Sequence, residues 1–272
     1  MMKHYRYLLM RWLTQIAIIV LYVGANVWGW KILQGDLSAS KLMGIVPLAD
    51  PYAVLQIVFT GATLGMDIIL GALIVAVFYG IVGGRAFCSW VCPVNMITDS
   101  AAWLRRKMKL SEIQKRFYIN RSIRYWILGL GLILSAVMGV AAFELISPVS
   151  MAHRGIIFGM GMGGGALAVI FLFDLLVHEN GWCGYICPLG ASYALIGKFS
   201  FIRVHHDANK CTDCRACVTV CPEKEVLHMI NRSSESVLMG ECTNCGRCID
   251  VCQDNALGFS IRSQLKQPKD EE

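Results

Sequence analysis

The stretch KCTDCRACVTVC, Lys210–Cys221, decides the fold of the C-terminal part of the chain, and ECTNCGRCIDVC, Glu241–Cys252, repeats it. Every cysteine of the first stretch recurs 31 residues later, so both stretches have the spacing C-x2-C-x2-C-x3-C. Three closely spaced thiolates with a remote fourth favour an iron–sulfur cluster, because zinc ribbons use paired C-x-x-C knuckles instead. The repeat therefore predicts two cluster sites in one small domain.

Bacterial ferredoxins that hold two 4Fe-4S clusters have this spacing, and in them the fourth cysteine of each run binds the other cluster. Such crossed ligation predicts a first cluster on Cys211, Cys214, Cys217 and Cys252, and a second on Cys221, Cys242, Cys245 and Cys248. We expect a small α+β ferredoxin-like domain over residues 201–260, followed by a polar tail over residues 261–272.

The remaining cysteines form a second repeat nearer the N-terminus. FCSWVCPVN, Phe87–Asn95, and WCGYICPLG, Trp182–Gly190, share the motif C-x-x-x-C-P, and the two copies lie 95 residues apart. Cysteines four residues apart share a helix face, and the proline suits the start or end of a helix. Three uses stay open: a shared metal centre, redox-active thiols, or simple packing of buried side chains. They concern Cys88, Cys92, Cys183 and Cys187.

Long apolar stretches dominate the rest of the chain. Of its 272 residues, 56% are hydrophobic and 16% are charged, which excludes disorder and argues against a water-soluble enzyme. Four stretches approach the roughly 20 residues that a helix needs to cross a bilayer; they are Leu13–Trp30, Ile68–Val82, Tyr125–Phe143 and Gly155–Val177. We interpret the shorter apolar stretch 52–65 as an interfacial or re-entrant segment.

Each C-x-x-x-C-P motif follows an even-numbered apolar stretch, so the sequence predicts a mostly α membrane protein. Its residues 1–200 would form four transmembrane helices as two related hairpins. Lysine and arginine are dense before the first span, between the second and third, and after the fourth. Because positive residues mark the cytoplasmic side, both termini and the ferredoxin domain are expected there. The net charge of +6 is modest, and the basic residues cluster beside apolar stretches, so nucleic acid is not an expected partner.

Apolar hairpins, a duplicated C-x-x-x-C-P motif and a C-terminal two-cluster ferredoxin domain together resemble a family of ferredoxin-type membrane proteins. Its members include NapH of the periplasmic nitrate reductase system, the nitrous oxide reductase maturation protein NosR, and the cytochrome oxidase assembly protein CcoG. Only twelve residues precede the first apolar stretch and twenty follow Cys252, so terminal domains like those of NosR and CcoG are not expected. The resemblance is therefore NapH-like.

That resemblance implies a quinol dehydrogenase subunit in the bacterial inner membrane. Such a subunit takes electrons from the quinol pool and passes them toward periplasmic nitrate reductase, with a NapG-like iron–sulfur protein and cytochromes as partners. The alternative is an assembly or maturation factor that binds or reduces copper through the C-x-x-x-C-P cysteines, because soft thiolates select Cu(I).

Ionisable groups in or near the membrane are the candidates for a quinol site, since quinol oxidation needs proton acceptors close to the headgroup. Four such groups fall near the outer ends of the expected spans; they are Asp67, Glu144, His153 and Arg154. Iron–sulfur clusters carry single electrons, and an apolar body gives access to lipid-soluble quinols. Electron transfer is therefore the function that the sequence favours.

Overall fold

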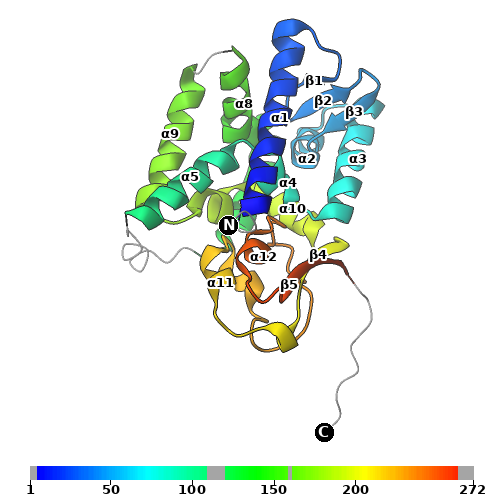
Figure 1. The fold of residues 1–272 in the computed structure, drawn as a ribbon. Helices are drawn as coiled ribbons and strands as arrows, with labels where there is room; N and C mark the ends of the chain where they lie inside the picture. The colour runs from blue at the N-terminus through cyan, green and yellow to red at the C-terminus, as the bar shows by residue number, and fades with distance from the viewer. Residues whose placement is uncertain (1–4, 109–119, 159–160, 263–272) are drawn as a thin grey trace.

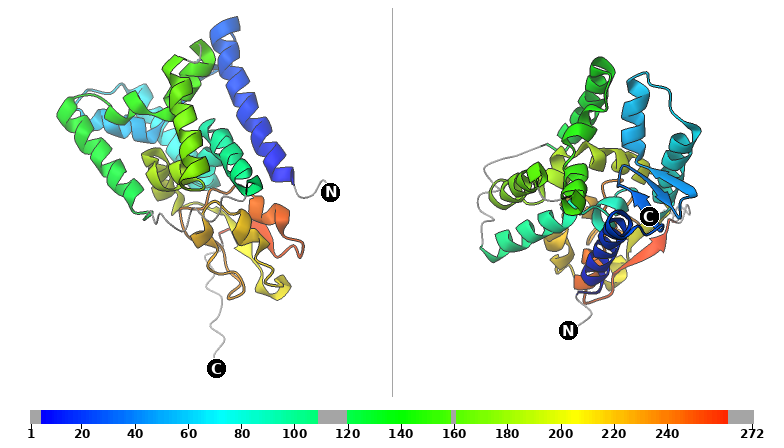
Figure 2. Two further views of the ribbon diagram at one scale, coloured as in Figure 1. Left: turned by 90° about the vertical axis from the view of Figure 1, so that its left-hand side faces the viewer. Right: turned by 90° about the horizontal axis from the view of Figure 1, so that it is seen from above.

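The computed structural model describes residues 5–108, 120–158 and 161–262. It has two parts, a body of helices and a small C-terminal domain that lies against one end of this body (Figure 1). The side view in Figure 2 agrees, with the yellow and orange C-terminal segments below the same ends of the blue and green helices.

The first half of the helical body begins with a long helix and continues through a small sheet into four further helices. Its elements are α1 (Arg6–Trp28), β1 (Leu33–Gly35), β2 (Ala39–Leu42), β3 (Val46–Ala49), α2 (Pro51–Phe59), α3 (Met66–Val82), α4 (Ala86–Trp90) and α5 (Val94–Lys107). The second half contains α6 (Ile123–Met138), α7 (Ala142–Ile146), α8 (Pro148–Phe158), α9 (Gly161–Leu176), the π-helix η3 (Trp182–Ile186) and α10 (Pro188–Gly197).

Helix α1 is the one helix in the described ranges that is long and apolar enough to cross a membrane, by length and composition. It starts well before the expected span, at Arg6, and ends at Trp28 because Gly29 adopts the left-handed conformation with φ 70°. Shorter apolar helices cover Met66–Val82, Ile123–Met138 and Gly163–Leu176. The mostly helical fold is confirmed, whereas the crossing of the membrane by all four segments stays a prediction.

Two of the expected spans are interrupted. The third was expected to continue to Phe143, but α6 ends at Met138, where Gly139 has φ 69°, and a separate short helix follows. The fourth was expected as one helix over Gly155–Val177, but α8 and α9 are separate helices that pack against each other. Gly139, which lacks Cβ, adopts its left-handed conformation without strain.

A three-stranded antiparallel sheet between α1 and α3 was not predicted. Its order is β1-β2-β3, with Leu33 opposite Leu42 and Leu42 opposite Val46. It lies toward the end of the body that is remote from the C-terminal domain (Figure 1). Helix α3 approaches β3 closely at Gly71, where an added Cβ would lie only 3.1 Å from the backbone nitrogen of Ala49.

The segment expected to be re-entrant forms α2, a helix of nine residues. At 1.5 Å per residue such a helix is far too short to cross about 30 Å of hydrocarbon. Pro51 occupies its first turn, and the side chain of Asp50 caps it by accepting a hydrogen bond of 3.0 Å from the backbone nitrogen of Ala53. The buried Gln56 ties α2 to α7 by accepting a hydrogen bond of 2.9 Å from the nitrogen of Phe143.

Apolar side chains face outward on the longest helices, and polar side chains lie between them. Leu13 of α1, Leu73 of α3 and Val137 of α6 are more than half exposed, whereas Arg11 and Gln15 of α1 are completely buried. A soluble protein rarely leaves so much apolar surface uncovered, so this arrangement is typical of helices that contact lipid.

The C-terminal domain has the α+β composition that the sequence predicted. It consists of β4 (Ile202–His206), η4 (Ala208–Lys210), α11 (Ala216–Val220), η5 (Lys224–Leu227), α12 (Arg247–Val251) and β5 (Leu257–Ile261). Strands β4 and β5 pair antiparallel, with Ile202 opposite Ile261. Val204, Val226 and Val237 are completely buried in its core, and several of the cysteines pack against the same core.

Candidate electron-transfer site

The two cysteine runs of the C-terminal domain fold in the same way. Asp213 and Arg215 in the first run have φ of 53° and 54°, and the matching Asn244 and Gly246 in the second have φ of 47° and 74°. Each run then enters a short helix, α11 or α12, that carries its third cysteine. Asparagine, aspartate and glycine tolerate this left-handed conformation better than most residues, which suits Asp213, Asn244 and Gly246, whereas Arg215 adopts it as a residue that rarely does.

The eight cysteines of this domain gather in two groups. Burial raises the pKa of the Cys217 thiol, and Cys252, Cys211 and Cys214 lie close enough to raise it further. Burial likewise raises the pKa of Cys221, with Cys245 and Cys242 as its neighbouring thiols. The fourth cysteine of each run thus faces cysteines of the other run.

The second group of thiols lines a cavity. Cys221, Cys242, Cys245 and Cys248 all contribute to its wall. The other lining side chains include Val226, Leu227 and Val237, which exclude water from the sulfurs. Buried thiols around a small apolar cavity are the donor set that an iron–sulfur cluster requires.

The four C-x-x-x-C-P cysteines come together between the two halves of the helical body. Cys88 lies on α4, Cys92 follows it, Cys183 lies on η3, and Cys187 precedes Pro188 at the start of α10. Burial raises the pKa of Cys183 well above its ordinary value, and the neighbouring thiols Cys187, Cys92 and Cys88 contribute to the shift. We call these four residues the thiol quartet.

Both prolines of the repeat mark helix starts, as expected, since α5 begins directly after Pro93 and α10 begins at Pro188. The structure therefore brings both C-x-x-x-C-P copies to one place. In the described ranges, no three His, Cys, Asp or Glu side chains lie at the spacing of a single metal-ion site.

Arg85 connects the thiol quartet to the C-terminal domain. Its guanidinium donates hydrogen bonds of 2.8 Å to the carbonyl oxygen of Cys183 and 2.9 Å to that of Glu241, next to Cys242. It also forms an ion pair with Glu223, two residues after Cys221. Arg121 is a second ion-pair partner of Glu223. The contacts of Arg85 therefore join the quartet to the segments beside the second group of ferredoxin cysteines.

The loop between Cys242 and Cys245 rests directly on the first C-x-x-x-C-P motif. Ser89 donates a hydrogen bond of 2.7 Å to the carbonyl oxygen of Thr243, and the indole nitrogen of Trp90 donates one of 3.1 Å to that of Asn244. Asn244 in turn donates 3.0 Å to the carbonyl oxygen of Val82. Ser89 and Trp90, between Cys88 and Cys92, therefore bind the backbone between Cys242 and Cys245.

Three backbones also meet at this junction. A Cβ on Gly84 would overlap the carbonyl oxygen of Tyr193, and one on Gly240 would overlap that of Ala194. A Cβ on Gly197 would lie 3.0 Å from the carbonyl oxygen of Gly240. Only glycine allows α10, the segment before α4 and the ferredoxin loop to approach so closely.

A second set of ion pairs holds α1 and α5 to the C-terminal domain. Buried Asp99 of α5 pairs with Arg11 of α1 and with Arg247 of α12. The sequence analysis did not identify these residues. Arg11 belongs to the basic residues before the first apolar stretch, and no local pattern relates it to Asp99 or Arg247.

Of the four groups expected near a quinol, Glu144, His153 and Arg154 lie around the Asp36–Ser38 turn and α8, whereas Asp67 lines a different pocket. Glu144 accepts hydrogen bonds from Ser38 and Ser150 and lines a small cavity. His153 is buried edge-on against Tyr22, with ring centroids 4.5 Å apart.

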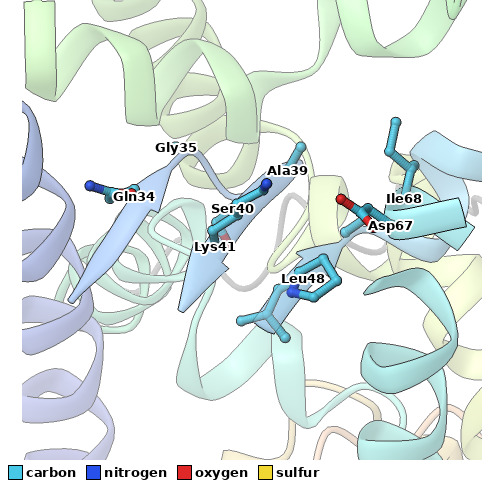
Figure 3. A pocket seen from close by; sticks show the side chains of 10 residues that line it. Gln34, Gly35, Ala39, Ser40, Lys41, Leu48, Asp67 and Ile68 are labelled. Carbon is cyan, nitrogen blue, oxygen red and sulfur yellow. The ribbon is translucent and has the colours of Figure 1, made fainter. Parts of the chain in front are cut away.

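Arg154 and His153 share Asp36 as a neighbouring charge. Arg154 is exposed and pairs with Asp36 at 3.6 Å. Asp67 lies beside a different, open pocket of about 320 Å³ on the three-stranded sheet. Figure 3 shows it opposite the strand residues Gln34, Ser40 and Lys41. None of the cysteines lines this pocket.

Asp50, which precedes Pro51 at the start of α2, is a buried acid that the sequence did not single out. It lines the same cavity as Glu144. Burial raises its pKa to about 7, and the hydrogen bond from Ala53 and the nearby Tyr193 hydroxyl oppose the shift. One of its carboxylate oxygens, Oδ1, has no hydrogen-bond partner in the described part of the chain.

Comparison with known proteins agrees with this arrangement. A family described as "4Fe-4S binding domain" matches residues 64–111 and 159–204, which contain the two C-x-x-x-C-P copies. A family described as "4Fe-4S dicluster domain" matches residues 203–253. The chain thus carries 4Fe-4S binding domains, with eight cysteines in the C-terminal dicluster region. No solved structure matches the chain.

Several curated proteins are similar over most of their length. The ferredoxin-type protein NapH of Haemophilus influenzae is 42% identical over 86% of this chain and 82% of its own, and NapH of Escherichia coli is 42% identical over 83% and 78%. The methylamine utilization ferredoxin-type protein MauN of Methylorubrum extorquens is 38% identical over 88% and 83%. With the long apolar helix α1, these matches indicate association with a membrane. The chain belongs to the family of ferredoxin-type iron–sulfur electron-transfer proteins that includes NapH and MauN.

Proposed function

We propose that this protein oxidises quinol in the bacterial inner membrane and passes the electrons through its ferredoxin clusters to the thiol quartet. In this proposal Cys211, Cys214, Cys217 and Cys252 bind the first cluster, and Cys221, Cys242, Cys245 and Cys248 bind the second. The gathering of each set of thiols supports the assignment. Each 4Fe-4S cluster supplies a one-electron carrier.

The contacts of Arg85 are the observation on which the proposed electron path rests. It contacts the quartet at Cys183 and the second cluster loop at Glu241 and Glu223. The first cluster lies further out, since Cys214 is exposed whereas Cys242, Cys245 and Cys248 are buried. The carriers therefore follow the order first cluster, second cluster, quartet. A redox centre on the quartet would extend this chain into the helical body.

The quartet supports a shared redox-active centre in this scheme. Its four sulfurs come from both C-x-x-x-C-P copies, and both copies fall within matches to a 4Fe-4S binding family. Thiolates from two segments that meet in an apolar core can hold a cluster or other soft metal centre. Such a centre would receive electrons from the second cluster and deliver them toward the remote end of the body.

We further propose a multi-pass arrangement in which α1, α3, α6 and α9 span the inner membrane and the ferredoxin domain is cytoplasmic. The outward-facing apolar side chains of these helices support it. A periplasm-dependent reporter at Ser38, between β1 and β2, should be active, and one after Glu272 should be silent. A silent reporter at Ser38 and an active one after Glu272 would show that the topology is the opposite of the proposed one.

The NapH-like resemblance favours periplasmic nitrate reductase as the final electron acceptor. A NapG-like iron–sulfur protein and cytochromes would then be the partners. Similarity to MauN, whose name refers to methylamine utilization, gives a second system in which such a carrier works. Deleting the gene tests the choice. Loss of quinol-dependent nitrate reduction, with the reductase still active toward an artificial donor, would support the nitrate system.

Anaerobic titration of the purified protein tests quinol oxidation directly. Ubiquinol or menaquinol should bleach the cluster absorbance and generate the EPR signals of reduced clusters. If neither quinol reduces clusters that dithionite does reduce, the protein does not oxidise quinol. Stoichiometric Cu(I) on the quartet, with failure of copper enzymes to mature in the deletion strain, would support the assembly function instead.

A further inference from the structure

An apolar groove of about 730 Å³ lies where the helical body meets the ferredoxin domain. Its walls on the body side come from three helices, with Leu8 and Trp12 on α1, Trp103 and Leu104 on α5, and Phe171 on α9. Binding sites for small organic molecules have volumes of about 300 to 1,000 Å³ and mostly apolar walls. The groove is of that size and character.

The opposite wall of the groove belongs to the two cluster helices. Val220 at the end of α11 directly precedes Cys221, and Val251 at the end of α12 directly precedes Cys252. Arg247, at the start of α12, directly precedes Cys248. Three neighbours of cluster ligands, which belong to both proposed clusters, therefore line the groove. A redox-active molecule bound there would lie beside the clusters.

Polar groups lie at the ferredoxin side of the groove. The Arg247 guanidinium forms an ion pair with Asp99, which also pairs with Arg11. A guanidinium has five N–H donors, so the pair with Asp99 leaves Arg247 able to donate to a ligand oxygen. The carboxylate of Asp250 accepts a hydrogen bond of 3.0 Å from the backbone nitrogen of Tyr7.

The edges of the groove have the composition of a membrane interface. Trp12 is 38% exposed and Trp103 is 57% exposed. Tryptophan concentrates at the level of lipid headgroups, and the apolar surface of α1 continues from Trp12 through Leu13 and Ile16. A ligand with an apolar tail and an oxygen-bearing aromatic head can enter such a groove from the bilayer, tail along the helices and head toward Arg247.

We propose that this groove binds the headgroup of an isoprenoid quinol, held between Trp12, Trp103 and Arg247. The inference rests on the proposed quinol oxidation and names its site. It places the quinol at the cluster end of the helical body. Asp67, Glu144, His153 and Arg154 are then not quinol ligands. No ferredoxin cysteine, and no residue next to one, lines the cavity that contains Glu144 and Asp50 or the pocket beside Asp67.

The test uses the full-length, cluster-loaded protein in lipid nanodiscs, with decylubiquinone carrying a photoreactive azido group as the probe. Illumination should label peptides containing Trp12 or Trp103, and unlabelled decylubiquinone should suppress the labelling. Labelling confined to residues 144–154 would overturn the proposal. Suppression by excess phospholipid but not by decylubiquinone would also overturn it, because the groove would then be a lipid site.

Variants give an independent measurement. Leu104→Trp should fill the groove, and Trp103→Ala should remove one wall at a partly exposed position. Each should raise the decylubiquinol concentration for half-maximal cluster reduction by about tenfold, equivalent to ~1.4 kcal/mol of binding free energy. Iron content and reduction by dithionite should stay unchanged. The matched control is Leu134→Trp on the exposed face of α6, which lies outside the groove.

These outcomes separate the site from the function. If decylubiquinol does not reduce the wild-type clusters, quinol oxidation fails, while photolabelling still reports whether quinone occupies the groove. If decylubiquinol reduces the clusters and both groove variants keep the wild-type half-saturating concentration, quinol oxidation stands and the assignment of its site is wrong.

Discussion

Arg85 donates a hydrogen bond of 2.8 Å to the carbonyl oxygen of Cys183, a residue 98 positions later in the chain. The bond joins the segment before the first C-x-x-x-C-P motif to a cysteine of the second. Because the same guanidinium pairs with Glu223, just after Cys221, one buried side chain holds three cysteine-bearing segments together. The junction between the body and the ferredoxin domain is thus built around the proposed electron path.

Removing the Arg85 side chain should weaken this junction. Arg85 is 1% exposed and Glu223 has only 3% of its side chain exposed. Breaking a buried pair from one side costs about 3 to 5 kcal/mol, because a buried charge loses its partner. The remaining pairs of Glu223 with Arg121 and Arg124 should keep the cost of Arg85→Gln at the lower end.

Thermal unfolding followed by loss of cluster absorbance measures this effect. As a control, Arg154→Gln removes an exposed ion pair, which should change stability by less than ~1 kcal/mol. Equal stability losses in both variants would contradict a special role for Arg85.

Crossed ligation makes a sharp prediction about the fourth cysteine of each run. Cys252→Ala should lose the same cluster as Cys214→Ala, and Cys221→Ala the same cluster as Cys245→Ala. Iron in the ferredoxin domain should fall from about eight atoms to about four in each variant. EPR spectra of the reduced proteins should match within each pair. If Cys252→Ala instead matches Cys245→Ala, each run binds its own cluster.

The thiol quartet should behave as one unit if it holds a shared centre. Cys88→Ala and Cys183→Ala, which lie in different halves of the body, should then remove the same spectroscopic signal and leave both ferredoxin clusters intact. Mössbauer spectroscopy of iron-57 protein, with metal analysis, measures this. Redox thiols would lose no metal but would resist alkylation in the oxidised protein. Free alkylation in every redox state would leave only a packing role.

Asp50 should make stability depend on pH. Its pKa is raised from 3.8 to about 7 by burial. Below pH 3.8 the carboxyl is protonated in both the folded and unfolded states. Between pH 3.8 and about 7 the unfolded chain ionises this group while the folded chain keeps the proton, so the folded state loses stability as pH rises. The full loss is on the order of 4 kcal/mol.

Asp50→Asn isolates this contribution, because asparagine can still cap α2. The drop in melting temperature between pH 4 and pH 8 should be smaller in the variant than in the wild type. Glu144 and Tyr193 also face Asp50, so Glu144→Gln serves as the companion variant. An unchanged pH profile in Asp50→Asn would show that the carboxyl ionises normally in the folded protein.

The two-cluster domain could be predicted from the sequence because the cysteine spacing that marks it is local and repeated. Cluster ligands within one run are fixed by the short distances between them, so C-x2-C-x2-C determines their positions wherever the domain folds. The helical composition followed in the same way from the length of the apolar stretches. Their limits were less certain, since the left-handed glycines that end α1 and α6 lie within apolar stretches that hydropathy alone reads as continuous.

Only the tertiary structure decided which distant residues meet. Arg11, Asp99 and Arg247 come from three segments, and nothing in their local sequence relates them. Asp50 reads as a turn residue, and its raised pKa arises only because α10 and the neighbouring loops bury it. The groove between α1, α5, α9 and the cluster helices is likewise formed by elements far apart in the chain. The sequence by itself determined the dicluster region with its eight cysteines, since the spacing within each run is local, whereas burial and ion pairing depend on packing between segments and needed the fold.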